Sequence, residues 1–308
     1  MSPRFAHLRL PVIAAPMFLV STPAFANACR DAGVVGTFPA LNARTTDDLR
    51  EWCTQMDKGD AVPPWGVNLI VHRTNPRLMD DLAVLEQHRP PLVITSLGAV
   101  PDLVAKVHGW GGQVFHDITN GHHARKAAAA GVDGIIAVAN GAGGHAGTWN
   151  PFALAAEIRA FFDGHLILAG CMNHGADVLA AEALGASYAY MGTRFIATQE
   201  AHASAEYKQM ILDAKVEDIV YTPAVSGVPA SFMRASLERA GYDLAKLNDP
   251  GSVDYGQKLK PADEEAKAWK TVWSAGQGVG AIHDLPTVAE LVERLHAERS
   301  TARAKLGA

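Results

Sequence analysis

The chain has 308 residues, of which 48% are hydrophobic and 19% are charged, a composition typical of a globular protein with a large buried core. Its formal net charge is −5 and its isoelectric point lies near 6.2. No cluster of Lys and Arg interleaves with aromatic residues, which argues against a nucleic-acid partner or an anionic membrane surface. The expected ligand is therefore a small molecule.

The three cysteines, Cys29, Cys53 and Cys171, have neither the even count of a disulfide framework nor the spacing of a metal site. We therefore expect a reducing, cytoplasmic setting. The apolar run from Leu10 to Val20 imitates a signal peptide, but two prolines interrupt it, and a first strand is the preferred interpretation. No apolar stretch reaches the roughly 20 residues of a transmembrane helix.

Short apolar runs alternate with helical segments along the first two thirds of the chain. Hydroxyl or Asn residues and early prolines mark the helix starts, and glycines mark several helix ends. The predicted strands cover residues 12–17, 34–38, 65–71, 92–96, 113–118, 134–139, 165–169 and 188–192. The predicted helices begin near residues 21, 45, 75, 101, 121, 151 and 175.

Eight strand–helix alternations with buried strand patterns predict a parallel α/β architecture. A closed (β/α)₈ TIM barrel is the first choice, and an open doubly wound sheet is the alternative, because periodicity does not show closure. We assign residues 1–195 and 266–308 to the barrel. Helical periodicity in residues 196–265 predicts a mainly helical insertion that packs on the barrel, and a helix from about 287 to 304 closes the chain.

The sixth strand runs into a glycine-rich loop around one histidine. Gly141, Gly143, Gly144 and Gly147 surround His145. Glycines let the backbone lie close against a ligand, and imidazole suits proton transfer near neutral pH. The loop is therefore predicted to leave room for a flat or charged ligand and to present His145 to it. The alternative is a glycine-rich turn with an incidental exposed histidine.

The loops after the seventh and eighth strands predict a phosphate site. Gly170 and Cys171 follow strand seven, and Gly192 and Thr193 follow strand eight. Barrels commonly bind phosphate between these two loops, through backbone N–H groups and a helix N-terminus. We interpret Arg194, which comes next, as a structural residue that holds the loop.

Histidines elsewhere in the chain do not suggest a metal. His116 and Asp117 end strand five, and because adjacent strand residues point to opposite faces, only one of them can face the barrel interior. The 13 histidines include no HxH or HExxH spacing, so no catalytic metal is predicted.

Six short motifs occur in a fixed order along the chain. They are Ala14-Ala-Pro-Met17 with Gly33, Gly66-Val-Asn68, Ala130-Gly-Val-Asp133, Ala142-Gly-Gly-His-Ala-Gly147, Met191-Gly-Thr-Arg-Phe195 and Trp273-Ser-Ala-Gly-Gln277. Together they resemble the nitronate monooxygenase family, formerly called 2-nitropropane dioxygenases. The resemblance spans nearly the whole chain. It implies a TIM barrel with non-covalent FMN, whose ring lies across the barrel mouth and whose phosphate lies on the strand seven and eight loops.

The resemblance also implies roles for individual residues, with His145 as the catalytic base. The implied cofactor-binding residues are Pro16, Met17 and Phe18 beside the flavin ring, Asn68 near its polar edge, Gly143 and Gly144 against the cofactor, Ala169, Gly170, Cys171, Gly192 and Thr193 at the phosphate, and Asp117 and Gln277.

Three departures from the family pattern bear on the substrate more than on the cofactor. Cys171 stands where relatives usually have a second glycine, although its backbone N–H can still bind phosphate. Asp117 stands where some relatives have lysine or another polar residue. Asn140-Gly-Ala142 replaces the common Gly-x-Glu-Ala before the Gly-Gly-His.

The resemblance implies an FMN-dependent oxidoreductase that converts nitronates or nitroalkanes with O₂ to a carbonyl compound and nitrite. One alternative is an NAD(P)H-dependent flavin reductase acting on quinones or an enoyl thioester. Another is a flavin-binding or sugar-phosphate-binding barrel without turnover. The sequence leaves the oligomeric state open, with a homodimer as one candidate.

Overall fold

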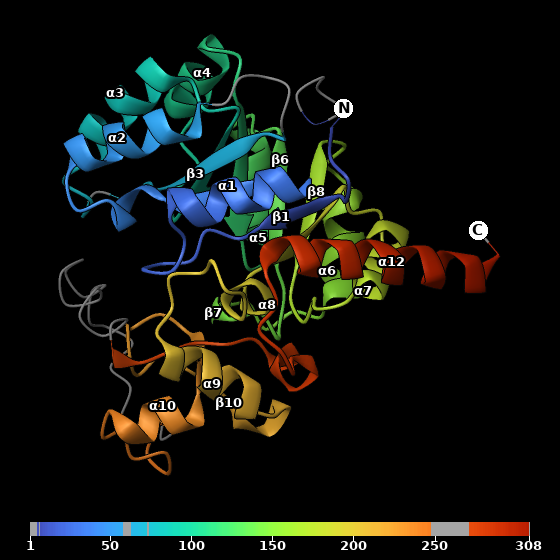
Figure 1. Cartoon of the computed structure of the whole chain (residues 1–308). Coiled ribbons are helices and arrows are strands. Elements are labelled where there is room, and N and C mark those ends of the chain that lie inside the picture. The colour runs from blue at the N-terminus through green and yellow to red at the C-terminus, as the bar shows by residue number, and fades with distance from the viewer. Residues whose placement is uncertain (1–4, 6, 58–62, 73, 248–270, 308) are drawn as a thin grey trace.

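Eight parallel strands form the central sheet of this protein (Figure 1). The computed structural model describes residues 5, 7–57, 63–72, 74–247 and 271–307. The strands lie in the order β1-β9-β8-β6-β5-β4-β3-β2. Their bounds are β1 Val12–Ala14, β2 Gly36–Pro39, β3 Trp65–Ile70, β4 Leu92–Ser96, β5 Gln113–Ile118, β6 Gly134–Val138, β8 His165–Ala169 and β9 Tyr188–Met191.

The two end strands of this order, β1 and β2, meet through a parallel bridge between Ile13 and Val35. The Val35 N–H donates to the Val12 carbonyl at 3.0 Å, and the Ala14 N–H donates to the Val35 carbonyl at 2.9 Å. The sheet therefore closes into a barrel, which confirms the predicted (β/α)₈ architecture and makes the open-sheet alternative wrong.

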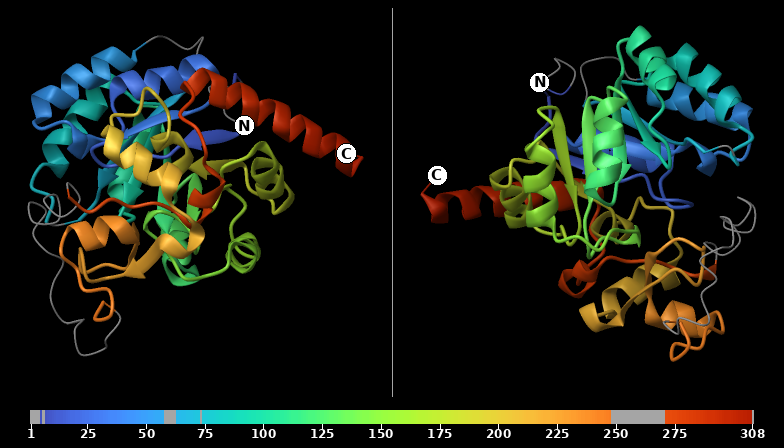
Figure 2. Two further views of the ribbon diagram at one scale, coloured as in Figure 1. Left: turned by 60° about the horizontal axis from the view of Figure 1, so that its bottom comes forward. Right: turned by 180° about the vertical axis from the view of Figure 1, so that it is seen from behind.

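In the part of the chain that the structure describes, eight helices surround the barrel, and each predicted helix is present. They are α1 Pro23–Ala32, α2 Thr46–Met56, α3 Leu78–His88, α4 Pro101–Gly109, α5 Gly121–Ala129, α6 Pro151–Arg159, α7 Gly175–Ala183 and α12 Val288–Leu306. Hydroxyl caps begin several of them, as at Thr22, Thr45 and Thr287. The last helix, α12, packs against α7 and α1 and completes the ring, while its C-terminal part projects beyond the barrel (Figure 2).

Large apolar side chains fill the barrel interior. The buried set is Phe5, Ile13, Val35, Leu92, Ile94, Phe115, Ile136, Ile167 and Tyr188. Phe5 lies at the amino-terminal end of the strands, with its ring centroid 5.7 Å from that of Tyr188 and 6.3 Å from that of Phe115. Because this end is packed, space for a ligand is available at the carboxyl ends of the strands, where barrels place their chemistry.

The segment after β9 lies over those carboxyl ends (Figures 1 and 2). It contains the helices α8 Thr193–Ile196, α9 Ala205–Asp213 and α10 Arg234–Arg239, and the strands β10 Ile219–Thr222 and β11 Ala230–Met233. The sequence predicted helices here and missed the two strands. Residues 248–265 of the predicted insertion lie outside the described residues.

Strand β11 also pairs with β7, a two-residue strand at Gly144–His145, so the insertion and the histidine loop share a three-stranded sheet. Among the described residues, 3₁₀ segments also occur at Ala40–Asn42, Val216–Asp218 and Gln277–Ala281. None of the helices in the described part of the chain has both the length and the apolarity needed to cross a membrane.

We predict that Phe5→Ala lowers the free energy of unfolding by roughly 3–5 kcal/mol, because it leaves a cavity between buried aromatic rings. Urea unfolding measures the change. The matched control is Phe152→Ala, since Phe152 is 66% exposed and its loss should cost less than about 0.5 kcal/mol. Equal stability of the Phe5 and Phe152 variants would show that Phe5 does not support the barrel.

Candidate functional site

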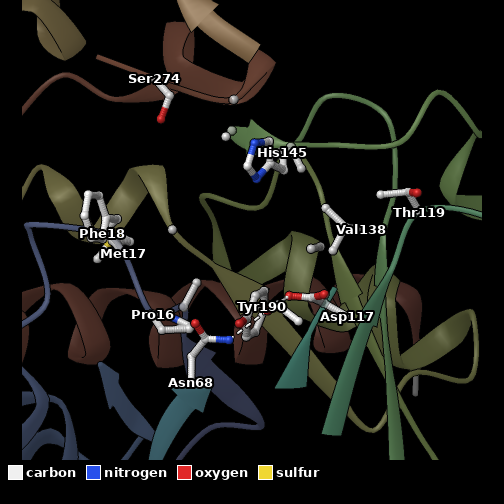
Figure 3. A pocket seen from close by; sticks show the side chains of 18 of the residues that line it. Pro16, Met17, Phe18, Asn68, Asp117, Thr119, Val138, His145, Tyr190 and Ser274 are labelled. Carbon is white, nitrogen blue, oxygen red and sulfur yellow. Dashed lines mark hydrogen bonds between the residues drawn. The ribbon is translucent and has the colours of Figure 1, made fainter. Parts of the chain in front are cut away.

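A cavity of about 850 Å³ opens at the carboxyl ends of the barrel strands, within the roughly 300–1,000 Å³ typical of small-molecule sites. Tyr207, Val228 and Trp273 contribute to its wall from the insertion and the segment after it. Figure 3 shows His145 and Ser274 on one side of the cavity, facing Pro16 and Asn68 on the other. The structure thus encloses one site between the barrel mouth and the insertion.

All of the predicted site residues except Gln277 line this cavity. They are Pro16, Met17, Phe18, Asn68, Asp117, Gly143, Gly144, His145, Ala169, Gly170, Cys171, Gly192 and Thr193. The side chain of Gln277 is exposed, and its backbone N–H donates to the Gly141 carbonyl at 2.9 Å. The backbone of Gln277 therefore supports the glycine loop, and its role beside the cofactor stays a prediction.

A chain of side-chain hydrogen bonds forms the cavity floor. The Asn68 Nδ2 donates to Ser96 Oγ at 2.8 Å and to the Ile94 carbonyl at 3.2 Å. Ser96 Oγ in turn donates to Asp117 Oδ2. The three residues come from the ends of β3, β4 and β5, so the inward-facing positions of neighbouring strands meet. His116, one residue before Asp117, instead contacts Thr95 Oγ1 at 2.8 Å, which fits the expected alternation along β5.

Burial is the main influence on the pKa values of the ionisable groups in this floor. It raises the pKa of Asp117 to about 6, against the lowering effect of the Ser96 hydrogen bond. The pKa of the Tyr190 hydroxyl is raised as well, first by burial and then by the nearby Asp117 carboxyl. Neutral forms of both groups are therefore favoured more than they would be in water.

Asn42 holds the loop that carries Met17 and Phe18. Its Nδ2 donates to the carbonyls of Met17 at 3.0 Å and Ser21 at 2.8 Å, and its Oδ1 accepts from the Leu19 N–H at 2.8 Å. Ser21 Oγ also accepts from the Met17 N–H at 2.9 Å. These contacts hold Leu19 at a φ of 61° and place Met17 and Phe18 side by side at the cavity (Figure 3).

Glycines bring the His145 loop against the C-terminal segment. A Cβ at Gly143 would lie 2.8 Å from the Gly276 nitrogen, so no larger residue fits there without a backbone shift. Gly144 has a φ of 68°, in the left-handed region, and a Cβ there would meet no atom of the described residues within 4 Å. The loop is therefore tightly packed on one side and open at Gly144, next to His145.

Several backbone N–H groups at the ends of β8 and β9 make no hydrogen bond within the described part of the protein. Within the described residues, none of the N–H groups of Gly170, Cys171, Gly192 and Thr193 donates to a protein acceptor. The Thr193 Oγ1 accepts from the Gly276 N–H at 2.9 Å, so its own hydrogen points elsewhere. Together these donors form a site suited to an anion.

The helix N-terminus expected to share the anion site is already occupied by carboxylates. Asp177 Oδ2 accepts from the N–H groups of Asn173 at 2.8 Å and His174 at 2.9 Å, and Glu298 Oε2 accepts from Gly175 at 2.7 Å. The loop amides, rather than the first turn of α7, are therefore available to an anionic ligand.

Cys171 and Arg194 flank the anion site. Cys171 adopts a φ of 55°, a left-handed conformation that glycine adopts without strain, which gives a physical reason for the glycine that relatives usually have there. The Arg194 guanidinium is buried and donates to the carbonyls of Ala197 and Asp284 and to Asp284 Oδ1 at 3.1–3.3 Å. Arg194 therefore holds the chain, as interpreted from the sequence.

Ser96 was expected at the ligand-binding end of the barrel because it ends a strand, but three other residues that contact the site or support it were missed. Tyr190 had a usable signal, since it occupies an inward position near a strand end. Ser226 and Ser274 had none, because the insertion and the C-terminal segment reach the site through long-range contacts. Ser274 lines the cavity, and its carbonyl accepts from the Tyr207 hydroxyl at 2.6 Å.

The raised pKa of Asp117 predicts a pH-dependent stability. The folded-state pKa of about 6 lies above the ordinary 3.8, so the stability contributed by the proton is complete below about pH 3.8 and is lost as the pH rises through about 6. The full loss is at most roughly 3 kcal/mol, with roughly 1 kcal/mol of it between about pH 5 and about pH 7.5.

Asp117→Asn keeps the side-chain shape and stays neutral, so its stability should lack this component. Chemical unfolding of the wild type and the variant at the two pH values measures it. The wild type is expected to lose stability relative to Asp117→Asn as the pH rises. Parallel stability curves would mean that Asp117 titrates as it does in water.

Comparisons with known proteins agree with this geometry. The nitronate monooxygenase family profile matches residues 73–298. A nitronate monooxygenase of Paraburkholderia phytofirmans is 30% identical, covering 94% of this chain and 92% of that protein. The structure of nitroalkane oxidase from Streptomyces ansochromogenes matches with a TM-score of 0.84 at 25% identity, covering 99% of this chain and 100% of that one.

One further relative carries a different activity in its name. An indene-carboxyl-CoA dehydrogenase of Mycobacterium tuberculosis is 29% identical, covering 92% of this chain and 91% of that protein. The family profile nevertheless spans most of this chain, and the barrel, the glycine loop and the motif order agree with it. The chain belongs to the nitronate monooxygenase family of oxidoreductases.

Proposed function

We propose that this protein is an FMN-dependent oxidoreductase that oxidises nitronates or nitroalkanes with O₂. The observation that carries the proposal is the position of His145 on a glycine loop, facing the same cavity as a set of unused amide donors. The family supports a flavin cofactor, and the anion site supports one that ends in a phosphate.

The residues present fit FMN. The amides of Gly170, Cys171, Gly192 and Thr193 would hold the phosphate, helped by the Thr193 hydroxyl. The open backbone at Gly144 and the side chains of Pro16 and Met17 leave a space suited to a flat ring. Asn68 and Asp117 offer polar groups to one edge of that ring. When bound, the flavin supplies the capacity to accept electrons from the substrate and pass them to O₂.

His145 would act on the carbon-bound proton. A neutral nitroalkane has to lose its α-proton to become a nitronate, and an imidazole in its neutral form accepts such a proton near neutral pH. An already anionic nitronate needs no proton removal, so for that substrate His145 would only orient the nitro group. The products of the oxidation are a carbonyl compound and nitrite.

A thioester-directed reaction is the second candidate, and the relative named as a carboxyl-CoA dehydrogenase favours it. In that case NAD(P)H would reduce the flavin, and a quinone or an enoyl thioester would reoxidise it. Anaerobic mixing with NADH separates the two candidates. Persistence of the visible flavin band supports nitronate oxidation, and rapid bleaching supports the reductase.

We predict that Gly192→Val yields protein without flavin. A Cβ at Gly192 would lie 3.8 Å from Ala15 Cβ and 3.9 Å from Met17 Sδ, so the protein itself tolerates a side chain there, and the added bulk enters the proposed phosphate space. The visible spectrum of the purified variant measures occupancy. The control is Gly109→Val, far from the cavity, where a Cβ would meet no atom of the described residues within 4 Å.

Both variants should give a folded barrel by circular dichroism, and only Gly192→Val should be colourless. Full flavin occupancy in Gly192→Val would place the phosphate elsewhere.

We predict that His145→Asn keeps the fold and the flavin, because glycines shape the cleft. Turnover of a neutral nitroalkane should fall by the ~10² to 10⁴ typical of a lost general base. Turnover of a pre-formed nitronate should fall much less. In the wild type, the nitroalkane rate should rise with pH as the imidazole loses its proton and then level off.

The two substrates control for each other. Equal losses on both would assign His145 to anion binding rather than proton removal, because a lost hydrogen bond to the nitro group weakens both alike. No loss on either would remove nitronate oxidation as the function.

A further inference from the structure

We propose that Leu97 selects the substrate by the length of an unbranched hydrocarbon chain, so that the preferred nitro compound carries such a chain. This inference rests on the proposed function and names a class of substrate within it. Leu97 directly follows β4, lines the cavity and is 48% exposed. An apolar side chain that is half exposed inside a cavity favours the binding of a ligand that removes it from water.

Leu97 belongs to a set of aliphatic side chains on one side of the cavity. We call this set the aliphatic wall, and its members are Leu41, Ile70, Leu97 and Ala99. They come from the end of β3 and from the segments directly after β2 and β4, three strands that are neighbours in the sheet. These side chains carry no charge and no hydrogen-bonding group, so they recognise a ligand through apolar contact alone.

The aliphatic wall and the anion site lie on opposite sides of the barrel mouth. In the closed ring of eight strands, β4 lies four places from β9, and β3 lies four places from β8. The amides suited to a phosphate follow β8 and β9, whereas the wall lies at β2, β3 and β4. A phosphate held by those amides therefore leaves the wall available to the substrate.

The backbone holds Leu97 in a conformation that leucine rarely adopts. Its φ is 64°, in the left-handed region that is unfavourable for residues with a Cβ. The loop is held on both sides of Leu97. The Val71 N–H donates to the Ser96 carbonyl at 2.8 Å, and Gly98 approaches Val71 so closely that a Cβ on it would lie 2.4 Å from the Val71 oxygen.

Other residues with this unfavourable conformation also lie near the cavity. Among the described residues, the non-glycine residues with positive φ are Leu19, Arg89, Leu97 and Cys171. Arg89 ends α3, whereas Leu97 and Cys171 line the cavity and Leu19 follows Phe18, which also lines it. Backbone strain of this kind is concentrated at ligand sites, so the position of Leu97 is consistent with a role in binding.

The expected signature is a steady rise of kcat/KM with chain length. A fully covered methylene favours binding by about fourfold. Because the wall covers a chain from one side, we expect roughly two- to fourfold per carbon from ethyl nitronate to hexyl nitronate. The chain is remote from the reacting carbon, so the change should fall mainly on KM. A flat or falling series would overturn the proposal.

Substitutions of Leu97 test whether this residue causes the rise. Leu97→Ala should reduce the preference for hexyl over ethyl nitronate by roughly three- to tenfold, because it removes three carbons from the wall. Leu97→Asn should reduce the preference at least as much while remaining as stable as the wild type in urea, because asparagine tolerates the left-handed conformation. A loss in Leu97→Ala that is absent from Leu97→Asn would assign the effect to the backbone and overturn the proposal.

The matched control is Val100→Ala in the same loop. Val100 is also aliphatic and is 40% exposed, but it is not among the residues that line the cavity. The variant should keep the preference of the wild type. A loss in Val100→Ala equal to that in Leu97→Ala would mean that the loop, and not the Leu97 side chain, selects the substrate.

A charged chain end is the competing interpretation, because His123 and Lys126 of α5 also line the cavity. Hexyl nitronate is therefore compared with the same compound carrying a carboxylate at the far end of its chain. Equal or slower turnover of the carboxylate compound supports the aliphatic wall. Clearly faster turnover would assign the chain end to the two basic residues and overturn the proposal.

A binding measurement separates this inference from the proposed function. If no nitronate is oxidised, the proposed function is wrong. Calorimetric titration of the purified flavin-loaded protein with n-alkanols, from propanol to octanol, needs no turnover. Affinity that rises with chain length in the wild type and rises less in Leu97→Asn supports the role of Leu97, and equal slopes in the two proteins would reject it.

Discussion

The close approach of two backbone segments, residues 141–143 after β6 and residues 275–277 before the last helix, is the constraint on which the site depends. A Cβ at Gly276 would lie 2.7 Å from the Gly141 oxygen, and one at Gly143 would lie 2.9 Å from the Ala275 carbonyl carbon. Only glycine permits this approach without a backbone shift. It joins the barrel to the chain that returns from the insertion, and it brings Thr193, through Gly276, into the same unit.

The insertion stabilises that returning chain as well as the histidine loop. The Tyr207 ring stacks on the Trp273 ring, with 4.9 Å between the ring centroids and an interplanar angle of 11°. The guanidinium of Arg239, which belongs to α10, lies 3.8 Å from the centroid of the Trp273 ring. Aromatic stacking and cation–π contacts of this kind are each worth roughly 0.5–1.5 kcal/mol. The insertion therefore lines part of the cavity and also holds Trp273 and the returning chain in place.

The eight barrel strands could be predicted from the sequence because strands buried on both faces appear as continuous apolar runs between capped helices. The glycine loop and the anion site could be placed because their residues directly follow those strands. The β10–β11 hairpin could not be predicted, since its pairing with Gly144 and His145 depends on contacts across more than eighty residues. The exposure of the Gln277 side chain could not be predicted either, because a motif gives the position of a residue in the chain but not the direction of its side chain.

The pairing of β7 with β11 also bears on the order in which the protein assembles. Barrel strands that are neighbours in the sequence can pair soon after they are synthesised, whereas β7 has to wait for Ala230 and Ser231, and the Gly141 loop has to wait for Gly276 and Gln277. Contacts of such long range carry a large loop-closure entropy and form late. We therefore expect a newly made chain to possess most of its barrel before it possesses an ordered histidine, so that the ability to react with a substrate arises only at the final stage of folding.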